Sequence, residues 1–284
     1  MRLPPIRLAT FNVLWRGATW SRRRPLMRRS IERARADVLG LQEVLSSRLA
    51  DIANLVAPLT IVPGPSTGPP RWFVSNACPE RNQAGEHLPI AYRADRFELL
   101  DTGGFWVSAT PERPGSLLPL APSPFLVHWA RLARRDAPES LLVLNAHFGH
   151  APWHHGPTVR IVAAKLAELE AANVGRRESS TSSAFLLGDF NAVRSSLLLR
   201  SLTSPSGARF VDAARSAVAR AGPPVTFHWG RGSKRFGLTL DYVLARSPRS
   251  ARYAEVIDLH EGRLYPSDHH LVVVEFSPPA DQDA

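Results

Sequence analysis

Short apolar runs recur along this chain, separated by segments rich in Pro, Gly and charged residues. Runs of about four to eight apolar residues bounded by turn residues are typical of buried β-strands. The pair at 88–92 and 97–107 is predicted to form a hairpin that turns near Ala94–Asp95. The predicted strands are residues 6–11, 37–41, 88–92, 97–107, 141–148, 185–187, 225–229, 238–245, 253–259 and 271–276.

Helical spacing of apolar residues lies between several of these strands. Ser21 is the predicted N-cap of the first helix, and Pro25 is tolerated in a first turn. Residues rich in Pro and Gly predict loops between the elements. No internal repeat or long linker is visible, so we expect a single domain over residues 1–284, with a core from about 6 to 277 and a frayed C-terminal tail. The predicted helices are residues 21–36, a helix that ends near 56, 158–172 and 211–220; the predicted loops are 63–86 and 111–124.

Composition indicates a folded protein with an anionic partner. Hydrophobic residues make up 44% of the 284 residues and charged residues 21%, which argues against disorder. The formal net charge of +10 favours a phosphorylated substrate, a nucleic acid or a membrane surface. Only Lys165 and Lys234 are lysines, so 33 of the 35 basic residues are arginine. With abundant Ala and Pro, this excess is also typical of a GC-rich genome, so the charge adds little by itself.

The same composition bears on the compartment. Cys78 is the only cysteine, which excludes an internal disulfide and is compatible with a reducing environment. The first twelve residues, MRLPPIRLATFN, lack the apolar stretch of a signal peptide. No window approaches about 18 consecutive apolar residues. We therefore expect a cytoplasmic protein without a membrane span, and no obligate protein partner is indicated.

Polar residues suited to catalysis lie at or near one end of the predicted strands. A core does not require polar residues there, whereas active sites assembled from strand ends and loops do. Carboxylate and amide oxygens suit Mg²⁺ or Mn²⁺, imidazoles can donate to a phosphoryl group, and a further carboxylate can activate water. No Cys/His cluster has the spacing of a structural zinc site. The residues concerned are Asn12, Glu43, His147, Asp189, Asn191, Asp241, Asp268 and His269.

Six segments, taken in order, resemble the endonuclease/exonuclease/phosphatase superfamily, the group of the deoxyribonuclease-like metal-dependent hydrolases. A lone GDFN would be a weak signal, but six motifs in one order are specific. The hairpin segment GEHLPIAYRADRFELLDTGGFWVS at 85–108 is similar to the bacterial branch of the family. The segments are LATFNVLW at 8–15, LGLQEV at 39–44, LNAHFGH at 144–150, LLGDFNAV at 186–193, LDYVLA at 240–245 and SDHHLVVVEF at 267–276.

The resemblance implies an α+β fold, a four-layer αββα sandwich of two mainly antiparallel sheets flanked by helices, with the site at one end of the sheets. By motif match, Glu43 is the principal ligand of Mg²⁺ or Mn²⁺, with Asn12 and Asp268 beside it. Asp189 would activate the attacking water, and Asn191 would hold that water or a phosphate oxygen.

The resemblance also implies roles for two histidines. His147 and His269 would stabilise charge on the phosphoryl group as the transition state forms. Asp241 matches a carboxylate that orients His269, and Glu86 matches one that orients His147. The chain departs from many bacterial relatives near His147, with Gly149 where Asp is common and Ala where Thr is common at 146. We expect altered substrate contacts there.

Other polar and aromatic residues allow two interpretations. The run HFGHAPWHHG at 147–156 suggests a metal cluster, but exposed loop histidines are common; His150 and Trp153 are the better candidates for substrate contact. His270 faces away from His269 by strand alternation and is predicted to be structural. The tryptophans could stack on bases or fill the core, with Trp106 predicted to pack. The arginines at 22–24 and 28–29 form either a solvated helix face or a polyanion contact.

The sequence therefore predicts a metal-dependent phosphoester hydrolase that uses metal-activated water. A nuclease-like phosphodiesterase is one form of this function, with nucleic acid as a candidate partner. A small-molecule phosphatase or phosphodiesterase on the same fold is the alternative. A catalytically inactive binding module is disfavoured because Asp189, Glu43 and His269 are all present.

Overall fold

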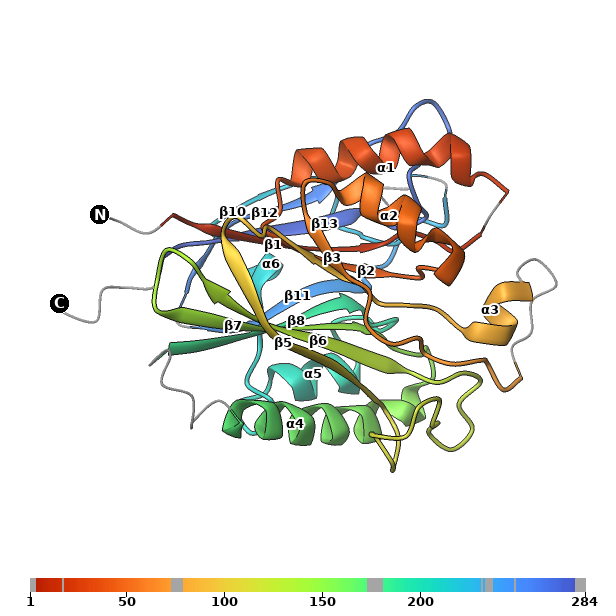
Figure 1. Cartoon of the computed structure of the whole chain (residues 1–284), viewed down its shortest axis with the longest axis vertical. Coiled ribbons are helices and arrows are strands. Elements are labelled where there is room, and N and C mark those ends of the chain that lie inside the picture. The colour runs from red at the N-terminus through yellow and green to blue at the C-terminus, as the bar shows by residue number, and fades with distance from the viewer. Residues whose placement is uncertain are drawn as a thin grey trace.

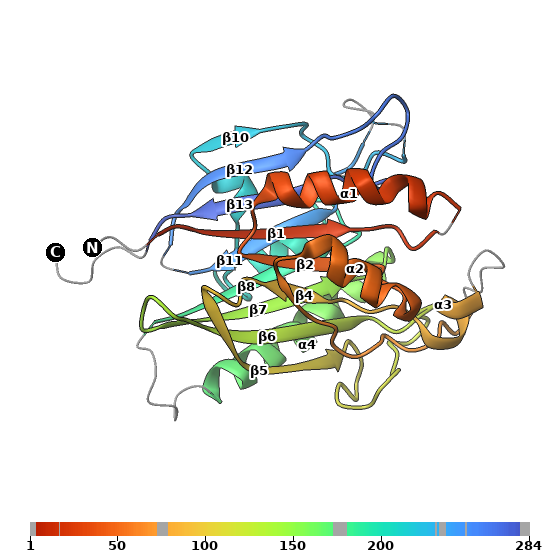
Figure 2. The ribbon, with the colours of Figure 1, turned by 45° about the horizontal axis from the view of Figure 1, so that its top comes forward.

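Two β-sheets lie face to face between two layers of helices (Figures 1 and 2). The computed structural model describes residues 4–16, 18–72, 79–172, 181–230, 232, 237–247 and 249–278. Cys78 and most of the predicted C-terminal tail lie outside these residues. The predicted α+β class with mainly antiparallel sheets in an αββα sandwich is confirmed.

The first sheet has seven strands, of which β1–β2 and β10–β12 are parallel neighbours and the others antiparallel. Its order is β10 (Ala219–Ala221), β12 (Ala251–Ile257), β13 (Leu271–Phe276), β1 (Ile6–Asn12), β2 (Val38–Gln42), β4 (Ile90–Tyr92) and β3 (Thr60–Val62).

The second sheet has six strands, and only β7–β8 is a parallel pair. Its order is β5 (Phe97–Trp106), β6 (Leu126–Arg134), β7 (Glu139–His147), β8 (Thr181–Asp189), β11 (Asp241–Arg246) and β9 (Val211–Asp212).

Helices cover the outer face of each sheet (Figure 1). α1 (Trp20–Ala34) and α2 (Leu49–Val56) pack on the seven-stranded sheet, and α4 (His155–Ala171) and α5 (Leu197–Thr203) pack on the six-stranded one. None of the helices in the described part of the chain combines the length and hydropathy that a membrane span requires. The short elements are α3 (Pro79–Ala84), α6 (Ala213–Ser216), η1 (Ser46–Arg48) and η2 (Pro152–His154).

Alternation along each strand divides the core into three layers. In β7, Leu141 and Val143 pack between the sheets, whereas Leu142 and Leu144 pack against α4 and α5. This period of two is the geometric property of a strand, whose successive side chains point to opposite faces. A strand end that continues the alternation therefore directs its last side chain either between the sheets or toward a helix.

The predicted hairpin at 88–107 is wrong. The two strands exist, but β4 pairs with β2 and β3 in the seven-stranded sheet, and β5 pairs with β6 in the other. Phe97, at the start of β5, is buried between the sheets. The chain thus crosses from one sheet to the other at 93–96. Because β4 and β5 are buried in separate sheets, the two strands cannot pair with each other.

Two further element predictions are wrong, and several observed elements were not predicted. The predicted helix at 211–220 is instead β9, the one-turn α6 and β10. The predicted strand at 225–229 forms only isolated bridges from Phe227. Strands β3 and β6 and helix α5 were not predicted, and the predicted loop 63–86 contains α3. In β6, charged and polar residues interrupt the apolar pattern.

The start of α1 also differs from the prediction. Thr19 is the N-cap, so Ser21 lies inside the first turn and Pro25 in the second. The helix begins early because Trp20 is buried in the core and its indole Nε1 donates to Asp51 Oδ2 at 3.0 Å. Tertiary packing of one aromatic residue thus outweighs the local cap signal.

Candidate active site

Three adjacent strands of the six-stranded sheet meet at one edge of the site, where β7 and β8 end and β11 begins. In the strand registers, His147 of β7 and Asp241 of β11 both lie opposite Asp189 of β8. Each continues the alternation of core residues that pack between the sheets, for example Phe185 and Leu187 in β8. All three side chains therefore point to the same interior face at one end of the sandwich.

The approach of β7 and β8 at this end depends on a glycine. Gly188 has φ +145°, and a Cβ there would lie 1.9 Å from the carbonyl oxygen of Ala146. An L side chain at this position would push the two strands apart. Gly188 therefore places Asp189 directly beside His147.

Asp189 lies at the centre of a converging set of donors. Its Oδ2 accepts a hydrogen bond from Asn12 Nδ2 at 3.0 Å and lies 3.7 Å from His147 Nε2 and 3.5 Å from His269 Nε2. Its Oδ1 accepts from the backbone N–H of Asn191 at 2.9 Å. The carboxylate is 1% exposed, so these contacts fix its orientation.

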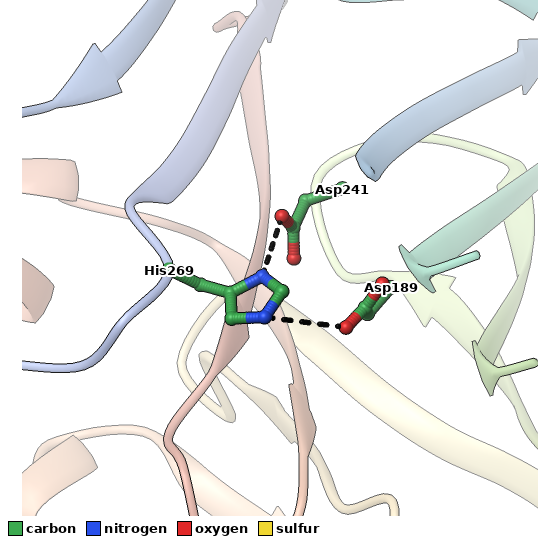
Figure 3. Close-up of side chains that lie close together, drawn as sticks. All are labelled: Asp189, Asp241 and His269. Atoms are coloured by element: carbon green, nitrogen blue, oxygen red, sulfur yellow. Dashed lines mark hydrogen bonds and ion pairs between the residues drawn. The ribbon is translucent and has the colours of Figure 1, made fainter. Parts of the chain in front are cut away.

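Each of the two histidines is held by a carboxylate on its other nitrogen. His269 Nδ1 lies 2.8 Å from Asp241 Oδ2, and His147 Nδ1 lies 3.1 Å from Glu86 Oε1. Figure 3 shows His269 between Asp241 and Asp189. The site thus contains two histidine–carboxylate pairs whose Nε2 atoms both face Asp189.

The carboxylates keep both imidazoles protonated. Burial disfavours the charged ring of His269, but the charges of Asp241 and Asp189 outweigh it and raise its pKa to about 10. Burial likewise opposes charge on His147, yet Glu86 and Asp189 raise its pKa to about 9. Two positive N–H donors consequently face the cavity at neutral pH.

The loop after β1 contacts the predicted metal ligands. Asn12 Nδ2 donates to Glu43 Oε1 at 3.0 Å, and the backbone N–H of Trp15 donates to Glu43 Oε2 at 2.9 Å. Glu43 follows the end of β2 with φ +62°, and Asp268 precedes β13. Glu43 and Asp268 both line the same cavity.

Two parts of the site are suited to a cation. Among the described residues, Asp189, Asp241 and His269 are the one group of three acidic or histidine side chains with ligand atoms within 4.8 Å of one another. A protonated His269 competes with a metal there. Glu43 is the other candidate, because burial and then the charge of Glu86 raise its pKa, and a nearby cation would relieve this unfavourable negative charge.

A cavity of about 560 Å³ opens onto these residues. Its apolar wall includes Leu120, Pro124 and Phe125, and the rim includes Trp153, which is 65% exposed. Both predicted substrate-contact residues, His150 and Trp153, line it. The cavity therefore has a charged floor and an apolar side.

The remaining histidines of the 147–156 run do not join the site as a metal cluster. His154 is buried, with Nε2 3.0 Å from the carbonyl oxygen of Pro119, and His155 is buried at the start of α4.

His270 is buried and its ring lies 4.2 Å from that of His228. Trp106 is buried, and its Nε1 donates to the Thr67 carbonyl.

Arg23 is a site-supporting residue that the sequence did not reveal. Its guanidinium donates to the carbonyl oxygens of Val13 at 2.8 Å, Leu14 at 3.0 Å and Pro266 at 2.7 Å. It also donates to the Arg16 carbonyl and the Thr19 hydroxyl. Arg23 therefore ties the segment after Asn12 to the segment before Asp268, and it forms neither a solvated face nor a polyanion contact.

Replacing Arg23 by glutamine is expected to lower the free energy of unfolding by about 3 kcal/mol or more, because several buried carbonyls lose a charged donor. Thermal unfolding followed by circular dichroism measures this loss. Arg22→Gln is the matched control, since Arg22 is exposed on the same helix, and it should change stability by less than about 0.5 kcal/mol. Equal stability of both variants would show that the Arg23 contacts are not stabilising.

A buried polar layer beneath the site was also missed. Gln42 Nε2 donates to Asn145 Oδ1 at 2.7 Å, and Asn145 Nδ2 donates to the Leu41 and Pro89 carbonyls. Gly40 makes room, because a Cβ there would lie 2.8 Å from Asn145 Oδ1. The position of Asn145 two residues before His147, on the same strand face, is the one signal that could have identified it.

A family model, the Endonuclease/Exonuclease/phosphatase family, matches residues 9–269. The chain belongs to the endonuclease/exonuclease/phosphatase family. The match confirms the family that the sequence motifs predicted, and members of this family are phosphoester hydrolases. No match was found among the sequences of curated proteins.

Solved structures with a similar fold match nearly the whole chain. The endonuclease/exonuclease/phosphatase from Bacteroides vulgatus has a TM-score of 0.81 and 20% identity, covering 97% of this chain and 100% of its own. A mannosyl-6-phosphatase from Bacteroides thetaiotaomicron has a TM-score of 0.79 and 21% identity, covering 95% and 99%. The human Nocturnin catalytic domain with bound sulfate has a TM-score of 0.69 and 18% identity, covering 98% and 96%.

Proposed function

We propose that this protein is a metal-dependent phosphoester hydrolase that acts on a compact phosphoester. The observation that carries the proposal is the convergence of His147 Nε2 and His269 Nε2 on Asp189, with each imidazole backed by its own carboxylate. A carboxylate beside two cationic donors can accept a proton from water while the donors hold an anionic phosphoryl group.

The donor set fits Mg²⁺ or Mn²⁺. Glu43 and Asp268 supply carboxylates at the cavity, and the amide of Asn12 contacts Glu43 directly. Mg²⁺ is commonly bound by only one or two carboxylates and keeps several waters, so this small set is sufficient. A cation held there by Glu43 and Asp268 would supply Lewis-acid polarisation of a phosphoryl oxygen and would lower the pKa of water.

The side chains of this chain account for the remaining steps. Asp189 takes the proton of the attacking water as its oxygen bonds to phosphorus, and the ester oxygen leaves. Asn191 fixes the local backbone, because its N–H donates to Asp189 and its Nδ2 donates to the Phe148 carbonyl at 2.8 Å. The imidazolium groups of His147 and His269 stabilise the charge that develops on the phosphoryl oxygens.

The shape of the site favours a compact substrate over a polyanion. The reactive groups line a concave cavity whose apolar side suits a small organic group. Four of the arginines that the structure describes, Arg23, Arg131, Arg134 and Arg249, are buried and do not present their charge to a polyanion. The fold neighbours include a mannosyl-6-phosphatase, which is consistent with a small phosphoester. A nuclease-like phosphodiesterase is the second candidate, supported by the exposed rim residue Trp153, on which a base could stack.

The substrate class can be tested by a screen of sugar phosphates, nucleotides and short oligonucleotides with Mg²⁺ or Mn²⁺. A compact substrate predicts turnover of small phosphoesters whose KM changes less than about threefold between 50 and 200 mM salt. A polyanion bound through several phosphates would lose about tenfold or more in affinity over the same range. Turnover of oligonucleotides alone, with a steep salt dependence, would establish the nuclease alternative instead.

His269 and Asp241 are expected to act as one unit. His269→Ala and Asp241→Asn should each lower kcat by about 10²-fold, because a positioned positive donor is lost or misoriented. The double variant should be little worse than His269→Ala, since both changes remove the same interaction. Steady-state kinetics of the four proteins form the cycle, and multiplicative losses would show that the two residues act independently.

A further inference from the structure

Arg81 lies at the wall of the cavity on the far side of the Glu86–His147 pair. It belongs to the short helix α3, and its side chain is 13% exposed. Its Nε lies 3.8 Å from Glu86 Oε2, while Glu86 Oε1 contacts His147. Arg81 and Glu86 both line the cavity.

The guanidinium of Arg81 has unused donors. Its Nε and Nη1 are buried and have no hydrogen-bond acceptor among the residues that the structure describes. The contact with Glu86 is too long for a hydrogen bond. Burying a charged donor without an acceptor is costly, and functional sites are where such groups are retained for a ligand.

A second arginine strengthens this end of the cavity. The guanidinium carbons of Arg81 and Arg16 lie 5.5 and 5.9 Å from the ring centre of Trp15, and all three residues line the cavity. The backbone N–H of Trp15 donates to Glu43, so this arginine–tryptophan corner is linked to the proposed metal ligand. Two positive charges beside an aromatic ring favour an anion, opposed only in part by Glu86, whose charge His147 also neutralises.

We propose that Arg81, with Trp15 and Arg16, forms a subsite that binds a second phosphate group of the substrate. The inference rests on the proposed function, since the scissile phosphoryl group would lie at the Nε2 atoms of His147 and His269. Arg81 lies on the Nδ1 side of His147, beyond Glu86, so a phosphate bound there is a different group. The subsite therefore selects bisphosphorylated compounds over monophosphates.

The alternative is that Arg81 only holds Glu86 in place. In that case Arg81→Gln would weaken the contact by which Glu86 orients His147, and it would lower turnover of every phosphoester to the same extent. A second-phosphate subsite instead makes the loss depend on whether the ligand carries the second phosphate. The ratio of two affinities distinguishes these roles, whereas a single activity measurement does not.

The test is calorimetric titration of glucose 6-phosphate and glucose 1,6-bisphosphate in Mg²⁺ buffer. The Asp189→Asn protein is used because it should bind without consuming the ligand. We expect the bisphosphate to bind about tenfold or more tightly than the monophosphate. Adding Arg81→Gln should reduce this preference to threefold or less, and Arg81→Lys should keep part of it. The same comparison of the dinucleotides TpT and pTpT shows whether the second phosphate can belong to a nucleic acid strand.

Arg200→Gln is the matched control, because Arg200 is exposed on α5 and does not line the cavity, and it should leave the preference unchanged. Equal affinity of the two glucose phosphates without any Arg81 change would overturn the subsite, even if the Arg81 variants failed to fold. An unchanged preference in Arg81→Gln would do the same. Full turnover by the Asp189→Asn protein would instead contradict the proposed function and leave the affinity ratio as a separate result.

Discussion

Replacing Asp189 by asparagine is expected to lower kcat by about 10³-fold or more, at the upper part of the range for a lost general base. The carboxylate is almost fully buried and lies within 3.7 Å of both imidazole Nε2 atoms. Asparagine keeps the size and one oxygen but cannot take up the proton of water. Steady-state kinetics on the best substrate of the screen measures the loss.

Two observations make this result interpretable. Circular dichroism and thermal unfolding should show the same fold as the unsubstituted protein, because the change is nearly isosteric. Asp95→Asn is the control, since Asp95 is exposed in the turn between the two sheets, and it should leave kcat unchanged. If Asp189→Asn retained more than a tenth of the activity, Asp189 would not be the base.

The second large effect concerns Glu43 and the metal. Glu43→Gln should lower kcat by about 10³-fold at a fixed low Mg²⁺ concentration, because a metal contributes several kcal/mol to charge stabilisation and glutamine lacks the ligand charge. A chelator should abolish activity of the unsubstituted protein, and Mg²⁺ or Mn²⁺ should restore it. Activity titrated against metal concentration gives the apparent affinity in each protein.

Glu98→Gln provides the matched control for the lost negative charge. Glu98 lies exposed on β5, so the metal titration of this variant should overlay that of the unsubstituted protein. Calorimetric titration with Mn²⁺ should show weaker binding in Glu43→Gln even where turnover is undetectable. Full activity in chelator, or unchanged metal affinity in Glu43→Gln, would remove Glu43 and the metal from the mechanism.

The candidate site was largely predictable because its members lie in short motifs at strand ends. Alternation places Asp189 and Asp241 on the same strand faces as the buried Leu187 and Val243, and His147 on the same face as Asn145 and the buried Val143. The structure brings Glu86 to His147 across 61 positions in the chain. The catalytic and metal roles of these residues stay predictions, as do the single-domain organisation and the cytoplasmic location.

The strand pairing was not predictable in the same way. Strands β4 and β5 have the spacing of a hairpin, yet each belongs to a different sheet. Strand composition reports burial and does not report the partner, because hydrogen-bonding edges look alike in every strand. β4 pairs with β2, and β5 pairs with β6. In neither pair does a short turn join the two strands, so the local pattern of β4 and β5 does not show which sheet each strand joins.

By itself, the sequence determined the family, the two-sheet sandwich and the set of polar residues at the strand ends. Only the tertiary structure decided what the arginines do: Arg23 is buried as a carbonyl clamp, whereas Arg81 lines the cavity and has two buried donors without an acceptor. The physical reason is that an arginine side chain is long and amphipathic, so its pattern along a helix is the same whether the guanidinium meets water, backbone or ligand. Its role is set by the acceptors that the fold brings around it.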